Sequence, residues 1–277
     1  LNKDYEIAYN NRGKALADLG EFEKSITDFD KAIKINPNYA AAYLGRGNSK
    51  KHIHDFVGAI NDFDTALSKN SNFYEAIFSK SLLLLLLGDY TSGLKLFESR
   101  WNAKKLNNIS IDRNKKLWLG DDSLDGKTLF ITYEQGLGDT IQFSRYLKKF
   151  KHFNCRVLLE VQKPLIEFVS TVSSSIKVFE AGHCDEEYDF YCPIMSLPLV
   201  FKTSLNNVPY QKPYLSSDPL KISKWLNILG EKTKPRIGIA WSGSKNNDQD
   251  KHRSTRLKHF AKFLDEKYEW ISLQKEY

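Results

Sequence analysis

The stretch KTLFITYEQGLGDTIQFSRYLKKF, residues 127–150, changes character twice within its length. Its opening letters KTLFIT form an apolar run typical of a strand, and residues 140–150 have the spacing of a helix. The short turn between them contains Gly136, Gly138 and Asp139. A strand followed by a glycine-rich turn and a helix is how α/β folds present backbone N–H groups and one side chain to a ligand. The stretch therefore predicts an α/β fold with a ligand site at this turn.

The same turn also admits a simpler interpretation. Glycine permits a positive φ and the close approach of another backbone, and aspartate is a favoured N-cap. Asp139 could then do no more than cap the helix that begins at Thr140. The turn is not the dinucleotide-binding fingerprint, because no third glycine follows Gly138 at the required spacing. Both interpretations stay open from these residues alone.

Alternating strand-like and helix-like segments continue after this turn. Continuous apolar runs separated by helical segments predict a buried parallel sheet. The runs expected to be strands are residues 156–161, 176–180 and 188–192, and a helix started by Pro164 falls between the first two. A helix over residues 218–229 then links to a new unit, which has strands at 236–241 and 269–273 and a helix at 257–266.

The N-terminal part has a different organisation, an internal repeat. Ala32 and Ala66 lie 66 − 32 = 34 residues apart, and the same spacing joins three more pairs: Gly13 and Gly47, Phe29 and Phe63, and Phe22 and Phe56. A 34-residue period with small residues at fixed points is the tetratricopeptide pattern of stacked helical hairpins. The sequence thus predicts about three tetratricopeptide repeats, in an α-solenoid over residues 1–107.

The third repeat departs from this pattern. Gly93 and Arg100 stand where small packing alanines are expected, as terminal repeats often differ from internal ones. We therefore expect this repeat to pack on the α/β region, with Trp101 and Trp118 largely buried there. The leucine run 82–87 is too short to span a bilayer, and we expect it to be a buried helix of the same repeat.

Composition and charge exclude several classes of function. The formal net charge of +7 invites a nucleic-acid partner, but Lys and Arg are scattered rather than clustered on one face, so we expect none. We expect no signal peptide, because the N-terminus is polar and its pattern is helical. Cys155, Cys184 and Cys192 lack metal-ligand spacing, and we interpret them as free thiols in a reducing cytoplasm. We expect the natural protein to be longer, because the chain begins with Leu1 and stops just after a strand-like run.

Several segments together carry a family resemblance. They are FESRW (97–101), LWLGDDSLDGKTL (117–129), EQGLGDTIQFSRY (134–146), YDFYCPIMSLP (188–198), RIGIAWSGS with HRS and a leucine (236–257) and SLQKE (272–276). In this order they resemble bacterial tetratricopeptide-repeat proteins fused to a glycosyltransferase-like domain of the GT-B type, related to heptosyltransferases and O-GlcNAc transferases. The resemblance implies a Rossmann-like first half with a linker helix at residues 108–232. It also implies an incomplete second half at residues 233–277.

The resemblance assigns roles to particular residues. Transfer of a sugar from a nucleotide diphosphate needs a base for the acceptor hydroxyl and donors for the departing diphosphate. Asp139 resembles the family's base, Gly136 and Gly138 would shape the turn, and Gln135 could form a hydrogen bond to the acceptor. Arg253 falls where the family places a basic residue near the donor phosphates, and the diphosphate would also be held by Ser242, Gly243, Ser244 and Ser254. The alternative for this second loop is a solvated charged segment.

No metal or bound cofactor is implied, since the nucleotide sugar is itself the substrate. Many other transferases bind a metal–nucleotide complex through a DxD pattern, which the relevant part of this sequence lacks.

A second candidate site lies on the repeats. Asn10, Lys14, Asn48 and Lys51 occupy repeat positions that normally face the concave groove of a solenoid. Asn and Lys side chains there could hold an extended peptide by its backbone or by an acidic terminus. The alternative is that these side chains are simply solvated.

Two functions therefore follow from the sequence. The first is a cytoplasmic glycosyltransferase-like protein that takes a nucleotide-sugar donor and an acceptor presented by the repeats. The second is a non-catalytic scaffold that binds proteins, with a degenerate or truncated transferase domain.

Overall fold

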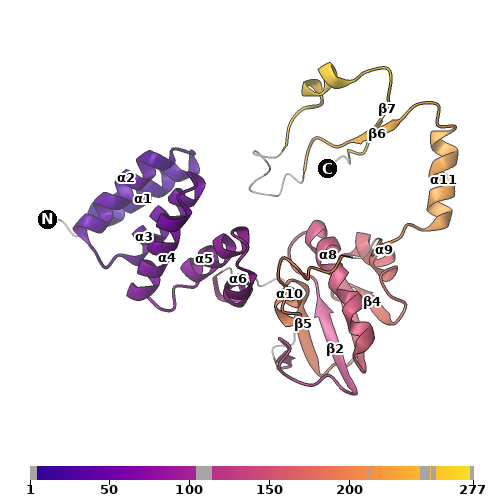
Figure 1. The fold of residues 1–277 in the computed structure, drawn as a ribbon, viewed down its shortest axis with the longest axis horizontal. Coiled ribbons are helices and arrows are strands. Elements are labelled where there is room, and N and C mark those ends of the chain that lie inside the picture. Colours follow the sequence, from indigo (N-terminus) through magenta and orange to yellow (C-terminus); the bar gives the residue numbers. More distant parts are fainter. Residues whose placement is uncertain (1–4, 104–113, 211–212, 244–249, 251–253, 275–277) are drawn as a thin grey trace. The chain divides into compact units, whose positions relative to one another are not determined.

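The computed structural model describes residues 5–103, 114–210, 213–243, 250 and 254–274 (Figure 1). The chain divides into two compact units, residues 1–216 and residues 217–277. The first unit contains helical hairpins followed by a parallel sheet with helices, and the second contains a short parallel strand pair. The chain is thus an N-terminal helical solenoid followed by an α/β arrangement.

The hairpins follow one another along the chain at the N-terminal end of the ribbon (Figure 1). Each helix packs on the next, and the pairs are α1 (Tyr5–Asp18) with α2 (Phe22–Ile35), α3 (Ala40–His52) with α4 (Phe56–Lys69), and α5 (Tyr74–Leu86) with α6 (Tyr90–Phe97). A short helix, α7 (Arg100–Ala103), follows.

Close helix packing in the repeats depends on glycines that face a phenylalanine. A Cβ atom added at Gly45 of α3 would lie 2.4 Å from the ring of Phe29, and one added at Gly13 of α1 would lie 2.9 Å from it. One repeat later, a Cβ at Gly47 would lie 2.7 Å from the ring of Phe63. Both rings are buried. The period seen in the sequence is therefore the period of a repeated core contact.

The leucine run of the third repeat is less buried than expected. Leu83 is fully buried, but Leu82, Leu86 and Leu87 are 40%, 67% and 48% exposed. A continuous apolar run in an α-helix places side chains on every side of the helix axis. The neighbouring elements cover only one side of α5, so the leucines on the other side stay exposed. No helix in the described part of the chain is long and apolar enough to cross a membrane.

Ion pairs also repeat along the solenoid. Arg12 of α1 contacts Asp28 of α2, and Arg46 of α3 contacts Asp62 of α4 in the same way. A second series of ion pairs joins neighbouring repeats. Asp30 contacts Arg46 and Asp64 contacts Lys80, both at 2.5 Å. Arg46 thus bonds to one aspartate in its own repeat and one in the repeat before it. The side chain of Asp62 is 5% exposed, so this pair is shielded from salt more than a surface pair is.

The pair of Arg12 and Asp28 makes the stability of the repeats depend on pH. A hydrogen bond from Arg12 lowers the pKa of Asp28 below its ordinary value. This carboxylate therefore stabilises the fold fully above its unfolded-state pKa of about 4, and that contribution is lost as the pH falls through the lower folded-state pKa. We expect Asp28→Asn to lower the free energy of unfolding at pH 7, by an amount that shrinks below about pH 4.

Urea unfolding of the wild type and of Asp28→Asn at several pH values between 7 and 2.5 measures the free energy of unfolding of each. Glu23→Gln is the matched control, because Glu23 is an exposed carboxylate on the same helix with no partner among the described residues. The prediction would be contradicted if the difference in the free energy of unfolding between the wild type and Asp28→Asn stayed constant with pH.

Within the described residues, the first unit contains a five-stranded parallel sheet in the order β1-β5-β2-β3-β4. The strands are β1 (Lys116–Leu117), β2 (Lys127–Thr132), β3 (Cys155–Val161), β4 (Ile176–Glu180) and β5 (Phe190–Pro193). Their connections contain α8 (Leu137–Phe143), the 3₁₀ helices η1 (Ser144–His152) and η2 (Lys163–Leu165), and α9 (Ile166–Ser170). After β5 come the 3₁₀ helix η3 (Ile194–Ser196) and α10 (Leu197–Val200).

The order of the strands places a switch point beside β2. The chain goes from β2 to β3 and then to β4 on one side, whereas β5 returns to the other side of β2. Ligands of open α/β sheets bind at the carboxyl ends of the strands where the order reverses. The turn that follows β2 and the segment that follows β5 meet at that edge.

The third repeat packs on the sheet region, as expected. Phe97 of α6 belongs to the same buried cluster as Trp118 and the apolar residues of β2 and β3. Trp118 is 2% exposed, and its indole N–H donates to the carbonyl of Asp122 at 2.9 Å. Trp101 differs from the expectation, because its side chain is only partly buried. A Cβ at Gly93 would lie 2.8 Å from Leu85, so close packing of α5 and α6 explains this glycine.

Two helices differ from the sequence prediction in type. Residues 140–150 were expected to form one α-helix, but α8 ends at Phe143 and η1 continues as a 3₁₀ helix. In the second unit, the helix expected at 257–266 is two short 3₁₀ turns, η4 (Leu257–His259) and η5 (Ala261–Phe263). Their N–H groups donate to the third residue back, as from Phe263 to Phe260, instead of the fourth.

The second unit contains α11 (Pro219–Leu229), β6 (Arg236–Ile239) and β7 (Glu269–Ser272), and the two strands pair in parallel. Asp218 caps α11 by accepting from the N–H of Leu220, and Gly230 ends this helix with a φ of 65°. These are the start and stop signals that the sequence carries.

Candidate functional site

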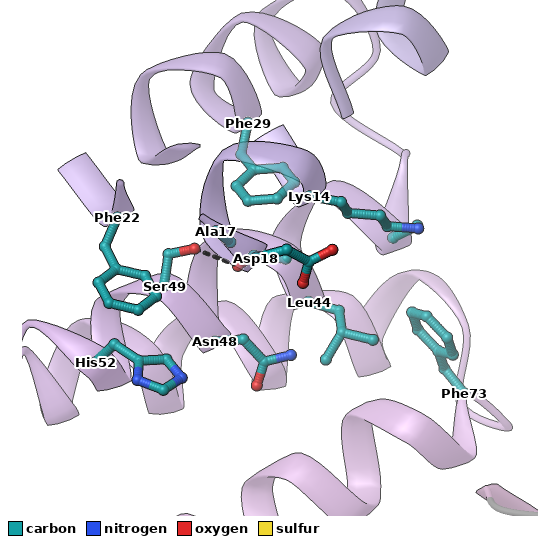
Figure 2. Close-up of a pocket in the computed structure, with 12 residues that line it drawn as sticks. Lys14, Ala17, Asp18, Phe22, Phe29, Leu44, Asn48, Ser49, His52 and Phe73 are labelled. Carbon is teal, nitrogen blue, oxygen red and sulfur yellow. Dashed lines mark hydrogen bonds between the residues drawn. The ribbon is translucent and has the colours of Figure 1, made fainter. Parts of the chain in front are cut away.

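The first candidate site is a hollow between helices of the first two repeats, about 290 Å³ in volume (Figure 2). Lys14, Ala17 and Asp18 of α1 form one side of it, and α3 contributes Ala41, Leu44, Gly45, Asn48, Ser49 and His52. Phe22 and Phe29 of α2 and Phe73 complete the lining. Apolar side chains thus form much of the wall, and a few polar groups stand among them, as in most binding pockets.

The residues predicted from the sequence are only partly brought together here. Lys14 and Asn48 line the hollow, whereas Asn10 and Lys51 are not among its lining residues. Asn10 was expected to be exposed, but only 1% of it is, because it shares with Gly13 the face of α1 that packs inside the repeats. Its Oδ1 atom has no hydrogen-bond partner within the described part of the chain. Lys51 is partly buried, which lowers the pKa of its amine.

Three polar lining residues, Asp18, Ser49 and His52, were not predicted from the sequence, although the repeat period could have identified Asp18 and His52. His52 and Asp18 stand 52 − 18 = 34 residues apart, as do Asn48 and Lys14, so each pair occupies one repeat position. The His52 ring stacks on Phe22 at 4.4 Å, and burial lowers its pKa, so His52 is neutral near pH 7. Lys14 and Asp18 carry opposite charges. The hollow is therefore close to neutral overall.

The second candidate site is the turn after β2. The sequence suggested Asp139 as the N-cap of the helix, but it is not the N-cap of α8. Gly136 is the N-cap, and Asp139 lies in the first turn, where its Oδ2 accepts the N–H of Gly136 at 2.9 Å. The other carboxylate oxygen, Oδ1, has no partner among the described residues. One oxygen therefore fixes the side chain, and the other has no protein partner among the described residues.

The glycines of this turn act differently from the expectation. Neither Gly136, with a φ of −88°, nor Gly138 has a positive φ, whereas Gln135 has a φ of 39°. A Cβ at Gly138 would meet nothing within 4 Å, so this glycine leaves open space beside Asp139. Gln135 is exposed, and the amide of Gln162, after β3, bonds both to its carbonyl and to Thr140. The neighbouring connection thus holds the turn in place.

A buried ion pair joins this turn to the last helices of the repeats. Arg100 donates from Nε to Oε2 of Glu134 at 2.8 Å and from Nη2 to Oε1 at 3.0 Å. It also donates to Glu98 at 2.8 Å and to Ser196, after β5, at 2.7 Å. The N–H of Met195 donates to Glu134 at 3.0 Å. The side chains of Arg100 and Glu134 are 0% and 1% exposed.

These contacts place Arg100 at the switch point of the sheet. Glu134 belongs to the turn after β2, and Met195 and Ser196 follow β5. Burial raises the pKa of Glu134, and the Arg100 guanidinium opposes this by favouring the carboxylate. The preceding repeats have Ala32 and Ala66 where the third has Arg100, and all three are fully buried.

In the second unit, the structure brings three of the predicted residues together. The N–H of Gly243 donates to the hydroxyl of Ser254 at 2.8 Å, and that hydroxyl donates to Asp250 at 2.5 Å. The N–H of Ser242 donates to the side chain of Gln274 at 3.0 Å. The N–H groups of Ser242 and Gly243 and the hydroxyl of Ser254 therefore already donate to acceptors within the second unit. Ser244 and Arg253 lie outside the described residues.

Comparison with known proteins supports the repeats. The family model described as tetratricopeptide repeat matches residues 7–39. Protein FlbA of Caulobacter vibrioides is 24% identical over 268 residues, which cover 89% of this chain and 39% of FlbA. The chain thus spans about two fifths of the length of this relative.

Two solved tetratricopeptide domains are among the structures that resemble part of this chain. The TPR2AB-domain:pHSP90-complex of yeast Sti1 is 23% identical and covers 39% of this chain and 42% of that one, with a TM-score of 0.36. The Arabidopsis OM64 TPR domain is 18% identical and covers 37% and 84%, with a TM-score of 0.35. The family match shows that the N-terminal region carries tetratricopeptide repeats, which form a protein-interaction domain.

Proposed function

We propose that the first two repeats bind an extended segment of another protein in the hollow between α1 and α3. The observation that supports this most is the set of polar side chains on its wall. Lys14, Asp18 and Asn48 line the hollow, and none of them has a side-chain partner among the described residues. An amide with both donor and acceptor groups suits a peptide backbone, which offers both in turn.

The third repeat indicates the chemistry of the bound segment. By the repeat period, Leu82 and Leu86 of α5 occupy the positions of Asn48 and His52 in α3. Both leucines are well exposed, at 40% and 67%. Apolar side chains of a partner would remove this surface from water. We infer a segment that is polar and near neutral where it meets α1 and α3, and apolar where it meets α5.

The prediction concerns Asn48→Ala. Peptides enriched from a random display library on the full chain provide the probe, and their dissociation constants are measured by fluorescence polarisation. Loss of one amide pair with the peptide backbone should raise the dissociation constant about two- to tenfold. Asn61→Ala is the matched control, because Asn61 is an exposed asparagine on α4 outside the hollow. If the wild type and Asn48→Ala bind the peptides with equal affinity, the hollow is not the binding site.

Sugar transfer is a second candidate function, favoured by the turn after β2. We propose that residues 108–232 form the acceptor half of a GT-B transferase and residues 233–277 the beginning of the donor half. Asp139 would be the base that takes the proton of the acceptor hydroxyl. The open space beside Gly138 and the unpartnered Oδ1 of Asp139 support this role.

Donor binding is assigned to the loop of the second unit. Ser242, Gly243, Ser244, Arg253 and Ser254 would hold the diphosphate of a nucleotide sugar, with Arg253 supplying the charge. The segment bound by the repeats would then be the acceptor. Turnover by a complete version of the protein that carries Asp139→Asn tests the proposal.

A further inference from the structure

A second hollow, about 260 Å³ in volume, lies along η1, and most of its lining residues are basic. In the segment SRYLKKFKH, the side chains of Tyr146, Leu147 and Phe150 are buried. The basic side chains of the same segment line the hollow instead, and they are Arg145, Lys148, Lys149, Lys151 and His152. The amphipathic pattern of η1 thus has an apolar side in the core and a cationic side on the hollow.

Among the residues that the structure describes, the Lys and Arg side chains of this hollow have no carboxylate partners. No acidic side chain lines the hollow, and none of its Lys or Arg residues forms an ion pair within the described residues. Elsewhere in the first unit, Lys50, Lys80 and Lys177 each contact a carboxylate. Like charges three or four residues apart on a helix destabilise it, so the cluster costs folding free energy that a bound anion would recover.

The hollow is held in shape by a tyrosine. The hydroxyl of Tyr214 donates to the carbonyl of Ile141 at 3.2 Å, which fixes the ring against α8. The Arg145 guanidinium lies 5.1 Å from the centre of that ring, and its Nε donates to the carbonyl of Gln142 at 2.9 Å. Lys148 donates to the carbonyl of Pro213 at 3.4 Å. Arg145 is therefore oriented before a ligand arrives, which lowers the entropic cost of binding.

We propose that this hollow binds the diphosphate group of a small molecule. A diphosphate carries several negative charges on oxygens that accept charge-assisted hydrogen bonds from Arg and Lys. A single carboxylate would leave most of these cations without a counter-charge. Nucleic acid fits less well, because its footprint is an extended basic face, whereas these cations surround one hollow. The site is separate from the turn of Asp139 and does not depend on either proposed function.

The test uses the full chain and inorganic pyrophosphate, with binding measured by isothermal titration calorimetry at 50 mM salt. We expect saturable binding, and an increase of about ten- to hundredfold in the dissociation constant for the double variant Arg145→Gln, Lys148→Gln. The double variant Lys34→Gln, Lys95→Gln removes the same charge from exposed lysines outside the hollow and should bind as the wild type does. Thermal melts of both variants confirm that each remains folded.

Three outcomes would overturn the proposal. The first is the absence of saturable pyrophosphate binding at 1 mM ligand, and the second is equal weakening in the control variant. The third is a competitor that binds at least as tightly as pyrophosphate. If orthophosphate does so, the group recognised is a single phosphate, and if a short RNA does so, the ligand is a nucleic acid.

Discussion

Replacing Arg100 with alanine is expected to lower the free energy of unfolding by about 3–5 kcal/mol, because it leaves the buried carboxylate of Glu134 without its counter-charge. Both side chains are almost fully removed from water, and two hydrogen bonds join them. Ser196 and Glu98 also lose a partner. Urea unfolding of the full chain, followed by tryptophan fluorescence, measures the loss.

Two further variants separate this explanation from a general effect of truncation. Lys116→Ala removes one partner of an exposed ion pair, with Asp122, and should change stability by less than about 1 kcal/mol. The double variant Arg100→Met, Glu134→Leu replaces the pair by apolar side chains of similar size and should recover much of the loss. A cost for Arg100→Ala as small as that for Lys116→Ala would show that the carboxylate is not stranded when the arginine is removed.

The elements that could be predicted from the sequence are those whose structure is determined by nearby residues. Strands β2 and β4 have the predicted bounds, because each is a short run, KTLFIT and IKVFE, in which β-branched and aromatic residues favour a strand. The repeats were predictable because a 34-residue period preserves the same contact between Gly47 and Phe63 as between Gly13 and Phe29. Strand β1 was missed, since its two residues become a strand only by pairing with β5.

The sites were less predictable, because their geometry depends on distant residues. Glu134 looked like one more polar residue of the turn, and only the buried Arg100, 134 − 100 = 34 residues earlier, gives it a role. Asp139 was identified by type and position, but its place inside the first turn of α8 depends on backbone angles at Gln135 and Gly136. Asn10 was assigned to the groove by repeat position, and packing of α1 buried it.

Replacing Asp139 with asparagine is expected to reduce sugar transfer by a complete version of the protein about 10²- to 10⁴-fold, the usual contribution of a general base. Asparagine has nearly the same shape, and its amide oxygen can still accept the N–H of Gly136, so the hydrogen bond that closes the first turn of α8 is kept. What asparagine cannot do is take a proton from the acceptor hydroxyl. The melting temperature should therefore stay within about 2 °C of the wild type while turnover falls.

A panel of nucleotide sugars, with transfer to a peptide that the repeats bind, provides the assay. Asp121→Asn is the matched control, because Asp121 is an exposed aspartate without a partner among the described residues, and its turnover should equal that of the wild type. If Asp139→Asn turns over undiminished, Asp139 only accepts the N–H of Gly136 in the first turn of α8, and its unpartnered Oδ1 has no part in the chemistry. If turnover falls while peptide affinity is unchanged, the loss lies in the chemical step. The repeats then bind the acceptor independently of the base that activates it.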